Sequence, residues 1–264
     1  MAGSRTTDGD QGDEALRVAV VQGGSRGLGL AFTEALLDRP DVDRVVATSR
    51  TPESSDGLLA LQERYPNALL CLPLDLRQEE SIRLAAAETR ARFGPRIHWL
   101  INCAGLLHGD DWGPEKRLED VDPKRLAAVF EINAFGPLVV TKHFFALLRH
   151  DERAIVANVS ARVGSIEDNR RGGWYAYRAS KAAQNMFTRT LALELSRRTS
   201  NVVCLALHPG TVDTDLSRPF QRNLPPEQLF DPNRAAGQLL RVMDECSAES
   251  TGRFFAWDGQ EIPW

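Results

Sequence analysis

Short apolar runs alternate along this chain with longer amphipathic segments. The apolar runs predict seven β-strands, at residues 16–21, 44–49, 68–74, 99–102, 154–160, 202–207 and 253–256. The first six are rich in Val, Ile, Leu and Ala without a clean alternation, which is typical of strands covered on both faces. The amphipathic segments predict helices at 27–37, 79–93, 123–148 and 175–198. This strand–helix succession predicts an α/β fold with a doubly wound, parallel seven-stranded sheet, helices on both faces and right-handed crossovers.

Composition narrows the class of protein. The 264 residues suit one larger domain, which we place at 15–264, after a polar and acidic tail at 1–14 that we expect to be disordered. The net charge of −4 gives no reason to expect nucleic acid or an anionic membrane as a partner. No apolar run is long enough to span a bilayer, and the first residues lack the pattern of a signal peptide. The four cysteines show neither paired nor metal-binding spacing; they are Cys71, Cys103, Cys204 and Cys246. We therefore expect a soluble, cytoplasmic protein without a metal.

A glycine-rich turn follows the first predicted strand and opens directly into the first helix. It reads Gly23-Gly24-Ser25-Arg26-Gly27-Leu28-Gly29. Glycines let the backbone turn sharply and approach a phosphate, and a helix N-terminus offers free N–H groups with a partial positive charge. The spacing Gly-x-x-x-Gly-x-Gly differs from the better-known Gly-x-Gly-x-x-Gly, but its place between strand and helix favours a nucleotide-binding turn.

Three further motifs follow in order along the chain. They are Ile101-Asn102-Cys103-Ala104-Gly105, Tyr177-Arg178-Ala179-Ser180-Lys181 and the segment that runs from Pro209-Gly210 through Val212 to Thr214. Together with the glycine-rich turn they resemble the short-chain dehydrogenase/reductase family from about Leu16 to the C-terminus, with Cys103 where the family has a second Asn. The segment from Asp168 to Tyr177 is similar to the C-factor and Sniffer-like carbonyl reductase group. The resemblance implies a single-domain Rossmann fold and hydride transfer between a nicotinamide dinucleotide and a small carbonyl or alcohol.

The resemblance also implies a set of cofactor contacts. They are Gly23, Ser25, Arg26, Gly27, Leu28, Gly29, Arg50, Asp75, Leu76, Asn102, Ala104, Gly105, Tyr177, Lys181, Pro209, Gly210, Val212 and Thr214. An acidic residue after the second strand would bind the ribose 2′-hydroxyl of NAD(H). This chain has Arg50 there, with Arg26 as a possible second clamp, and a guanidinium suits a phosphate through paired hydrogen bonds. We therefore expect NADP(H) rather than NAD(H).

Tyr177 and Lys181 are the expected catalytic pair. They are four residues apart on a predicted helix and so share one face. A carbonyl that accepts a hydride needs a proton, and a phenol titrates near 10 in isolation, so we expect the Lys181 ammonium to lower the pKa of Tyr177. The resemblance adds that Lys181 holds the nicotinamide ribose. Tyr175 cannot replace Tyr177, because Ala179 stands four residues after it.

Two further catalytic candidates are Ser160 and Asn133, and for each of them the sequence allows more than one role. Many relatives have paired serines after the fifth strand, the second of them catalytic, whereas this chain has Ser160-Ala161. Ser160 would bond the substrate oxygen, Ser165 would substitute for it, or no serine would contribute. Asn133 follows the family pattern of an Asn that kinks its helix and binds a water in a proton relay; the alternative is that it caps the segment restarting at Gly136.

The sequence leaves two functions open. One is an NADP(H)-dependent carbonyl reductase or alcohol dehydrogenase, and the other is a dinucleotide-binding signalling or regulatory protein with little turnover. We expect substrate walls from 106–113, 162–174 and 215–229, with Trp112, Trp174 and Phe220 forming an apolar or aromatic pocket. The resemblance implies a homodimer or homotetramer paired through the helices at 123–148 and 175–198. We also expect the apolar C-terminus to pack on a neighbouring subunit.

Overall fold

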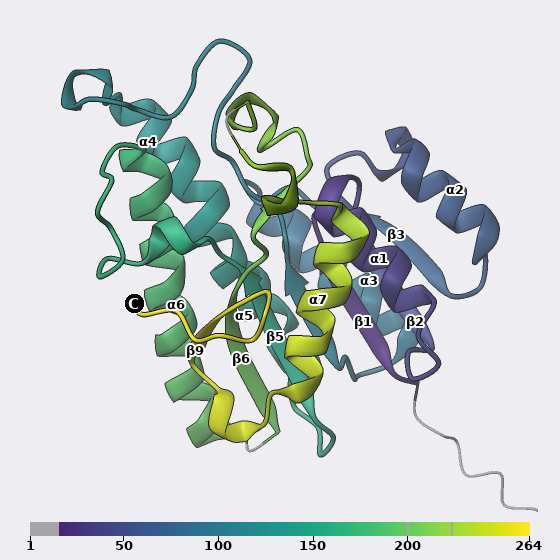
Figure 1. Cartoon of the computed structure of the whole chain (residues 1–264). Helices are drawn as coiled ribbons and strands as arrows, with labels where there is room; N and C mark the ends of the chain where they lie inside the picture. The colour runs from purple at the N-terminus through teal and green to yellow at the C-terminus, as the bar shows by residue number, and fades with distance from the viewer. Residues whose placement is uncertain (1–15, 200, 223) are drawn as a thin grey trace, which may run out of the picture.

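One parallel sheet of seven strands forms the centre of the molecule (Figure 1). The computed structural model describes residues 16–199, 201–222 and 224–264, so the expected tail at 1–14 lies outside the described residues. The strands lie in the order β3-β2-β1-β4-β5-β6-β9. Their bounds are β1 (Val18–Gln22), β2 (Arg44–Ser49), β3 (Leu69–Pro73), β4 (Trp99–Asn102), β5 (Ala154–Val159), β6 (Val202–His208) and β9 (Arg253–Ala256). The predicted fold class, a doubly wound Rossmann sheet in a single domain, is confirmed.

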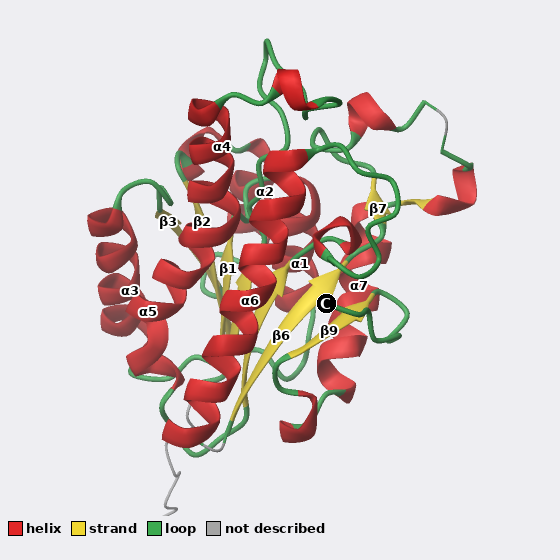
Figure 2. Cartoon of the chain, turned by 90° about the vertical axis from the view of Figure 1, so that its left-hand side faces the viewer, coloured by secondary structure: helices red, strands yellow, loops and turns green. Residues whose placement is uncertain are grey.

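The described residues form seven α-helices, and six of them cover the two faces of this sheet. The seven are α1 (Gly27–Leu37), α2 (Asp56–Arg64), α3 (Glu79–Phe93), α4 (Pro123–Phe130), α5 (Gly136–Leu148), α6 (Tyr175–Arg198) and α7 (Pro232–Glu245). Apolar side chains of α1, α2 and α7 pack on one face, and those of α3, α5 and α6 pack on the other. Figure 2 looks onto the second of these faces. Among the described residues, no helix combines the length and the apolar character needed to cross a membrane.

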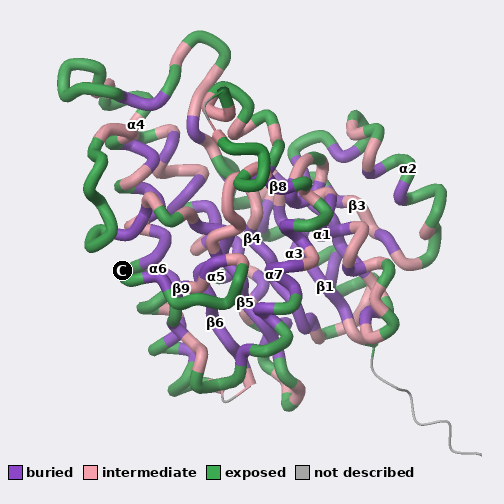
Figure 3. The backbone as a smooth tube through the Cα atoms, in the orientation of Figure 1, coloured by how far each residue is buried: buried purple, intermediate pink, exposed green. Residues whose placement is uncertain are grey.

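The strands are mostly apolar because both of their faces are covered. In β1, Ala19 and Val21 join the core under α1, whereas Val18 and Val20 join the core on the opposite side. Successive side chains of a strand point to opposite faces of the sheet. Because both faces are covered by helices here, apolar residues are needed at successive positions rather than at every second one. Figure 3 accordingly shows the central strands as buried. Each fully buried Val, Leu or Ile contributes roughly 1.5–3 kcal/mol from removal of its surface from water.

The structure contains elements that the hydrophobic pattern did not predict. Helices α2 and α7 were missed, as was the small parallel pair β7 (Thr211–Val212) and β8 (Leu229–Phe230). The start of α7 has a sequence signal that could have been used: Asp231 accepts hydrogen bonds from the backbone N–H groups of Asn233 and Arg234, and Pro232 occupies the first turn. The helix expected at 123–148 is divided by a π-helical turn at Glu131–Phe135.

The strand order places the functional loops. Strand β1 lies between β2 and β4, so the chain leaves β1 toward one side of the sheet and later returns to build the other side. Loops at the carboxyl ends of the strands diverge at this reversal, which is where α/β sheets of this kind bind ligands. The glycine-rich turn after β1 and the loop after β4 meet at this point.

A buried histidine, His98, lies at the amino ends of the strands, opposite the functional loops. The Nδ1 atom of His98 accepts a hydrogen bond from the Val18 N–H (3.2 Å), so its proton is on Nε2, which contacts Glu152 at 3.1 Å. Burial, with smaller contributions from His150 and Arg17, lowers the pKa of His98 despite the opposing effect of Glu152. The folded protein therefore holds this imidazole neutral.

Protonation of His98 should weaken the fold in acid. The folded-state pKa lies below the unfolded value of about 6.5, so the stabilisation is complete above pH ~6.5 and is lost as pH falls below it. At pH 7.5, His98→Gln should lower the free energy of unfolding by about 1 kcal/mol through the weakened bond to Val18. Urea unfolding at pH 7.5 and pH 5 should show this difference shrinking in acid. A difference that stayed constant between the two pH values would contradict this account.

Candidate active site

A cleft of about 890 Å³ opens at the carboxyl edge of the sheet. Its volume lies in the upper part of the range of small-molecule sites. Most of the residues predicted to bind cofactor or substrate line it: Gly23, Ser25, Arg26, Gly27, Leu28, Gly29, Arg50, Asp75, Leu76, Ala104, Gly105, Ser160, Tyr177, Lys181, Pro209, Gly210, Val212 and Thr214. Tertiary structure thus brings together segments from β1 to β7 that are separated by almost 200 positions.

The glycine-rich turn forms a cradle that has no room for side chains. The N–H groups of Gly23 and Gly24 both donate to Thr48 O at 2.9 Å, which holds the turn against β2. Gly23 has φ +84°, and a Cβ there would lie 2.8 Å from Ala104 N. Helix α1 begins just after the turn with no side-chain cap on its first N–H groups. These donors suit an anionic group such as the pyrophosphate of a dinucleotide.

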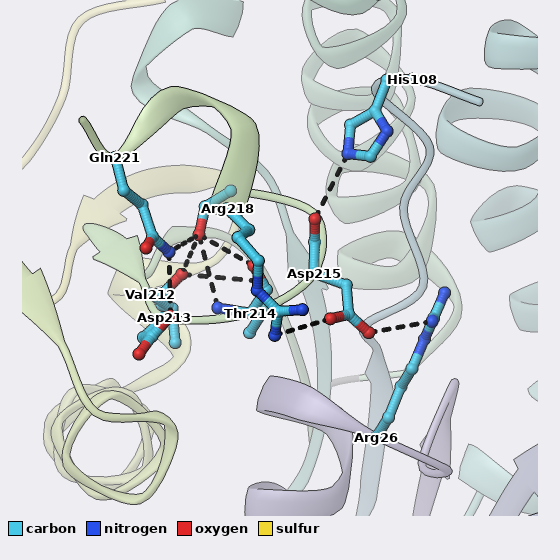
Figure 4. A network of polar contacts seen from close by, with 9 residues as sticks. Arg26, His108, Val212, Asp213, Thr214, Asp215, Arg218 and Gln221 are labelled. Atoms are coloured by element: carbon cyan, nitrogen blue, oxygen red, sulfur yellow. Dashed lines mark hydrogen bonds and ion pairs between the residues drawn. The ribbon is translucent and has the colours of Figure 1, made fainter. Parts of the chain in front are cut away.

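Basic and hydroxyl groups surround the outer end of this cradle. Arg50 lines the cleft directly after β2, next to Ser49, whose buried Oγ has no partner among the described residues. Arg26 is exposed and forms an ion pair with Asp215 at 3.1 Å across the cleft mouth. Figure 4 shows this carboxylate between Arg26 and Arg218, with the Asp215 carbonyl facing His108. A phosphate at this end would meet one guanidinium without a partner in the described chain and one that is shared with a carboxylate.

Tyr177 and Lys181 lie on the buried face of the first two turns of α6 and both reach the cleft. Lys181 Nζ donates to Val159 O (2.7 Å) and Gln184 Oε1 (3.0 Å), and it lies 5.9 Å from the centre of the Tyr177 ring. Burial raises the pKa of the Tyr177 phenol and lowers that of Lys181 to about 8. The expected lowering of the Tyr177 pKa by Lys181 is therefore wrong for this structure, because loss of hydration dominates.

The hydroxyl groups of the two serines after β5 form hydrogen bonds within the protein. Ser160 Oγ donates to Asn185 Oδ1 on α6 at 2.6 Å, and Ala161, the next residue, has no hydroxyl. Ser165 Oγ donates to Trp264 O (3.2 Å) and accepts from the Asp168 N–H (3.0 Å), and it does not line the cleft. Contact between Ser160 and a substrate oxygen would require the bond to Asn185 to break.

Two predicted asparagines lie beneath the cleft rather than in its wall. Asn133 lies in the π-helical turn, where its amide bonds both backbone polar groups of Leu106 (2.7 and 2.8 Å) and donates to Ser180 Oγ (3.0 Å). It makes no cap for α5, so the alternative role of capping is not observed. Asn102 Nδ2 donates to Asn158 Oδ1 at 2.8 Å in the buried layer under α6.

Aromatic side chains close one side of the cleft. Trp174 has φ +54°, a left-handed conformation that bulky residues rarely adopt. Its N–H donates to Glu115 O at 2.5 Å, and the buried Glu115 carboxylate accepts from the Ala176 N–H at 3.1 Å. This clamp places the Trp174 ring edge-on to Tyr177 (6.2 Å between ring centres) and 4.9 Å from Phe220.

One outcome differs from the expectations about the substrate walls. Trp112 does not line the cleft; its ring packs instead against Gly109 and under Arg125. His108 and Arg171 do line it, and both fall within the walls expected at 106–113 and 162–174.

The C-terminal segment packs on its own chain. Ile262 is 2% exposed in a small core with Phe254 and Ala256, and the Trp264 ring stacks on Phe254. The expectation that this segment packs on a neighbouring subunit is therefore wrong for Ile262.

Comparisons with known proteins agree with this geometry. Residues 17–225 match the short chain dehydrogenase family. The chain is 41% identical over 181 residues to the C-signal protein of Myxococcus xanthus, covering 69% of this chain and 100% of that protein. It superposes with a TM-score of 0.83 on an NADPH-bound carbonyl reductase from chicken fatty liver, at 29% identity and covering 95% of this chain and all of the other. It also superposes with a TM-score of 0.81 on the carbonyl reductase Sniffer of Drosophila melanogaster, at 25% identity and covering 95% of this chain and 100% of the other. The chain belongs to the short chain dehydrogenase family of oxidoreductases.

Proposed function

We propose that this protein is an NADP(H)-dependent carbonyl reductase in which Tyr177 supplies the proton. The observation that carries the proposal is the position of Tyr177 and Lys181, buried on one face of α6 and lining the same cleft as the glycine cradle. The NADPH-bound carbonyl reductase from chicken, which shares this fold, supports the choice of cofactor and reaction.

The residues present fit a phosphorylated dinucleotide. The cradle at Gly23 excludes even a Cβ, and the uncapped start of α1 offers N–H donors for the pyrophosphate. Arg50 and Arg26 would hold a 2′-phosphate, and Asp75 and Leu76 would flank the adenine. The cofactor supplies the hydride, and the protein supplies binding, orientation and the proton.

The titration of the two buried residues favours reduction. Burial keeps the Tyr177 phenol protonated at neutral pH, so the side chain is ready to donate to an oxygen that becomes an alkoxide. Lys181, with a pKa of about 8, carries its charge at pH 7 and loses it in mild alkali. Its ammonium would stabilise the phenolate left after proton transfer.

A turnover assay with Tyr177→Phe tests this proposal. We expect purified protein to bind NADPH and to oxidise it with members of a carbonyl panel. Tyr177→Phe should lower kcat by about 10²–10⁴-fold, because it removes the general acid and keeps the ring. The measurements are NADPH absorbance for turnover and fluorescence titration for binding.

Tyr175→Phe is the matched control. Tyr175 lies two residues earlier, is 43% exposed and does not line the cleft, so its hydroxyl should not affect kcat. NADPH binding without turnover on any carbonyl would instead support the second candidate, a dinucleotide-binding regulatory protein. The absence of a hydroxyl at Ala161 is the observation that favours this second function.

Arg50 should determine the preference between the two dinucleotides. Arg50→Ala should weaken NADPH binding by about tenfold or more, because a bond between charged groups is lost, while NADH binding changes little. Parallel titrations with both nucleotides measure this, with NADH as the internal control. Equal losses for NADPH and NADH would show that Arg50 does not contact the 2′-phosphate.

Ala161→Ser should increase turnover. The added hydroxyl would lie beside Ser160 and supply a donor to the substrate oxygen; removal of one such donor lowers rates by about 10²–10³-fold in other enzymes. We expect kcat/KM for a carbonyl to rise by roughly tenfold or more. A large fall in Ser160→Ala, with no gain in Ala161→Ser, would show instead that Ser160 leaves Asn185 and serves the reaction itself.

A further inference from the structure

One side of the cleft is unusually basic. Arg162 and Arg171 both line it, and Arg178 lies near the start of α6. Arg162 is paired with Asp168 at 3.2 Å. Arg178 donates to the carbonyls of Gly172 (3.1 Å), Gly173 (3.0 Å) and Val163 (3.3 Å). Arg171 makes no side-chain hydrogen bond or ion pair within the described part of the chain.

The backbone that carries Arg171 is held in place. Gly172 and Gly173 both have φ +65°, which turns the chain sharply, and Asn169 Oδ1 accepts the Gly172 N–H at 3.1 Å. The two carbonyls of this turn are the ones fixed by Arg178. The guanidinium of Arg171 is therefore presented from a well-anchored turn, although the side chain itself is solvated and has no partner among the described residues.

Positive charges lie close to one another at this turn. Burial is the first cause that lowers the pKa of Arg178, and the positive charge of Arg171 is the second. Arg162 likewise contributes, after burial, to lowering the pKa of His208 in the cleft to about 4. An oxyanion beside Arg171 would offset this positive potential, and a guanidinium matches a carboxylate through two parallel hydrogen bonds.

Apolar groups lie between this basic side and the catalytic tyrosine. Trp174, three residues after Arg171, faces Tyr177 and Phe220 and is held by the Glu115 clamp. Leu216 and Leu224 extend the apolar lining. The opposite loop contributes His108 and the carboxylate of Asp110.

We propose that the substrate is a carbonyl compound with an aromatic or other apolar body and a carboxylate, and that Arg171 binds this carboxylate. The inference rests on the proposed function: the carbonyl carbon receives hydride from NADPH, its oxygen receives the proton of Tyr177, and the carboxylate is unchanged. The apolar body packs against Trp174 and Phe220. Arg171 thereby determines specificity without touching the reacting atoms.

The test compares 4-formylbenzoate with its methyl ester, which differ in charge but not in the aldehyde or ring. In the unsubstituted protein, kcat/KM should favour the acid by about tenfold, as expected for a partly solvated charged hydrogen bond. Arg171→Ala should abolish this preference by reducing turnover of the acid and leaving the ester unchanged. Higher ionic strength should weaken the preference for the acid.

Arg170→Ala is the matched control. Arg170 is adjacent, also exposed, and absent from the cleft lining, so its removal changes net charge equally and should leave the acid preference intact. Equal kcat/KM for acid and ester in the unsubstituted protein would overturn the inference. An equal effect of the two arginine variants would also overturn it, because it would indicate a general field rather than a contact at Arg171.

Calorimetry separates this inference from the proposed function. Binding of the acid and the ester to the NADPH-loaded protein is measured for the same three proteins. Tighter binding of the acid that depends on Arg171, without NADPH oxidation, would contradict the reductase function and retain the carboxylate site. NADPH oxidation with no discrimination in binding or turnover would retain the reductase and remove the site.

Discussion

The polar face of α6 is the constraint on which the site depends. Five polar side chains of this helix are buried against the ends of β4 and β5: Ser180, Lys181, Gln184, Asn185 and Thr188. Buried polar groups need hydrogen-bond partners, and an unpaired one costs about 1–3 kcal/mol. Ser160, Asn158 and the Val159 carbonyl supply partners on β5 and the residue that follows it, and Asn133 supplies one from the π-helical turn. Sliding or rotating α6 would break several of these bonds together, so Tyr177 is held in one place relative to the sheet.

The two ends of the cleft are built by different means. At the dinucleotide end, backbone geometry dominates: the turn at Gly23 approaches Ala104 so closely that a side chain is excluded. At the other end, side chains from several loops define the space, with Trp174 held by Glu115 and Arg171 carried by the Gly172–Gly173 turn. Backbone cradles suit a group shared by many relatives, whereas side-chain walls can differ between proteins with one fold.

Burial, rather than mutual attraction, sets the protonation of Tyr177 and Lys181. The phenol of Tyr177 and the ammonium of Lys181 both shift toward their neutral forms because each is enclosed by protein. Lys181 directs its hydrogen bonds to Val159 and Gln184, away from the phenol. In the function we propose, this arrangement would make Tyr177 the proton donor, and Arg171 would bind the other end of the substrate.

The sequence by itself determined the sheet, the family and the glycine-rich turn that lines the cleft. Apolar runs covered on both faces and a glycine-rich turn before a helix are local patterns, and their order along the chain fixes a parallel topology. It missed α2 and α7, although the apolar residues of α7 pack in the main core. Only the tertiary structure showed that Ser160 turns to Asn185, that Asn102 lies beneath the cleft and that Trp112 lies outside it. It also showed which residues of the expected wall at 162–174 line the cleft, Arg171 among them. These outcomes depend on the direction of side chains and on contacts between segments distant in sequence, and neither is encoded in the periodicity of one segment.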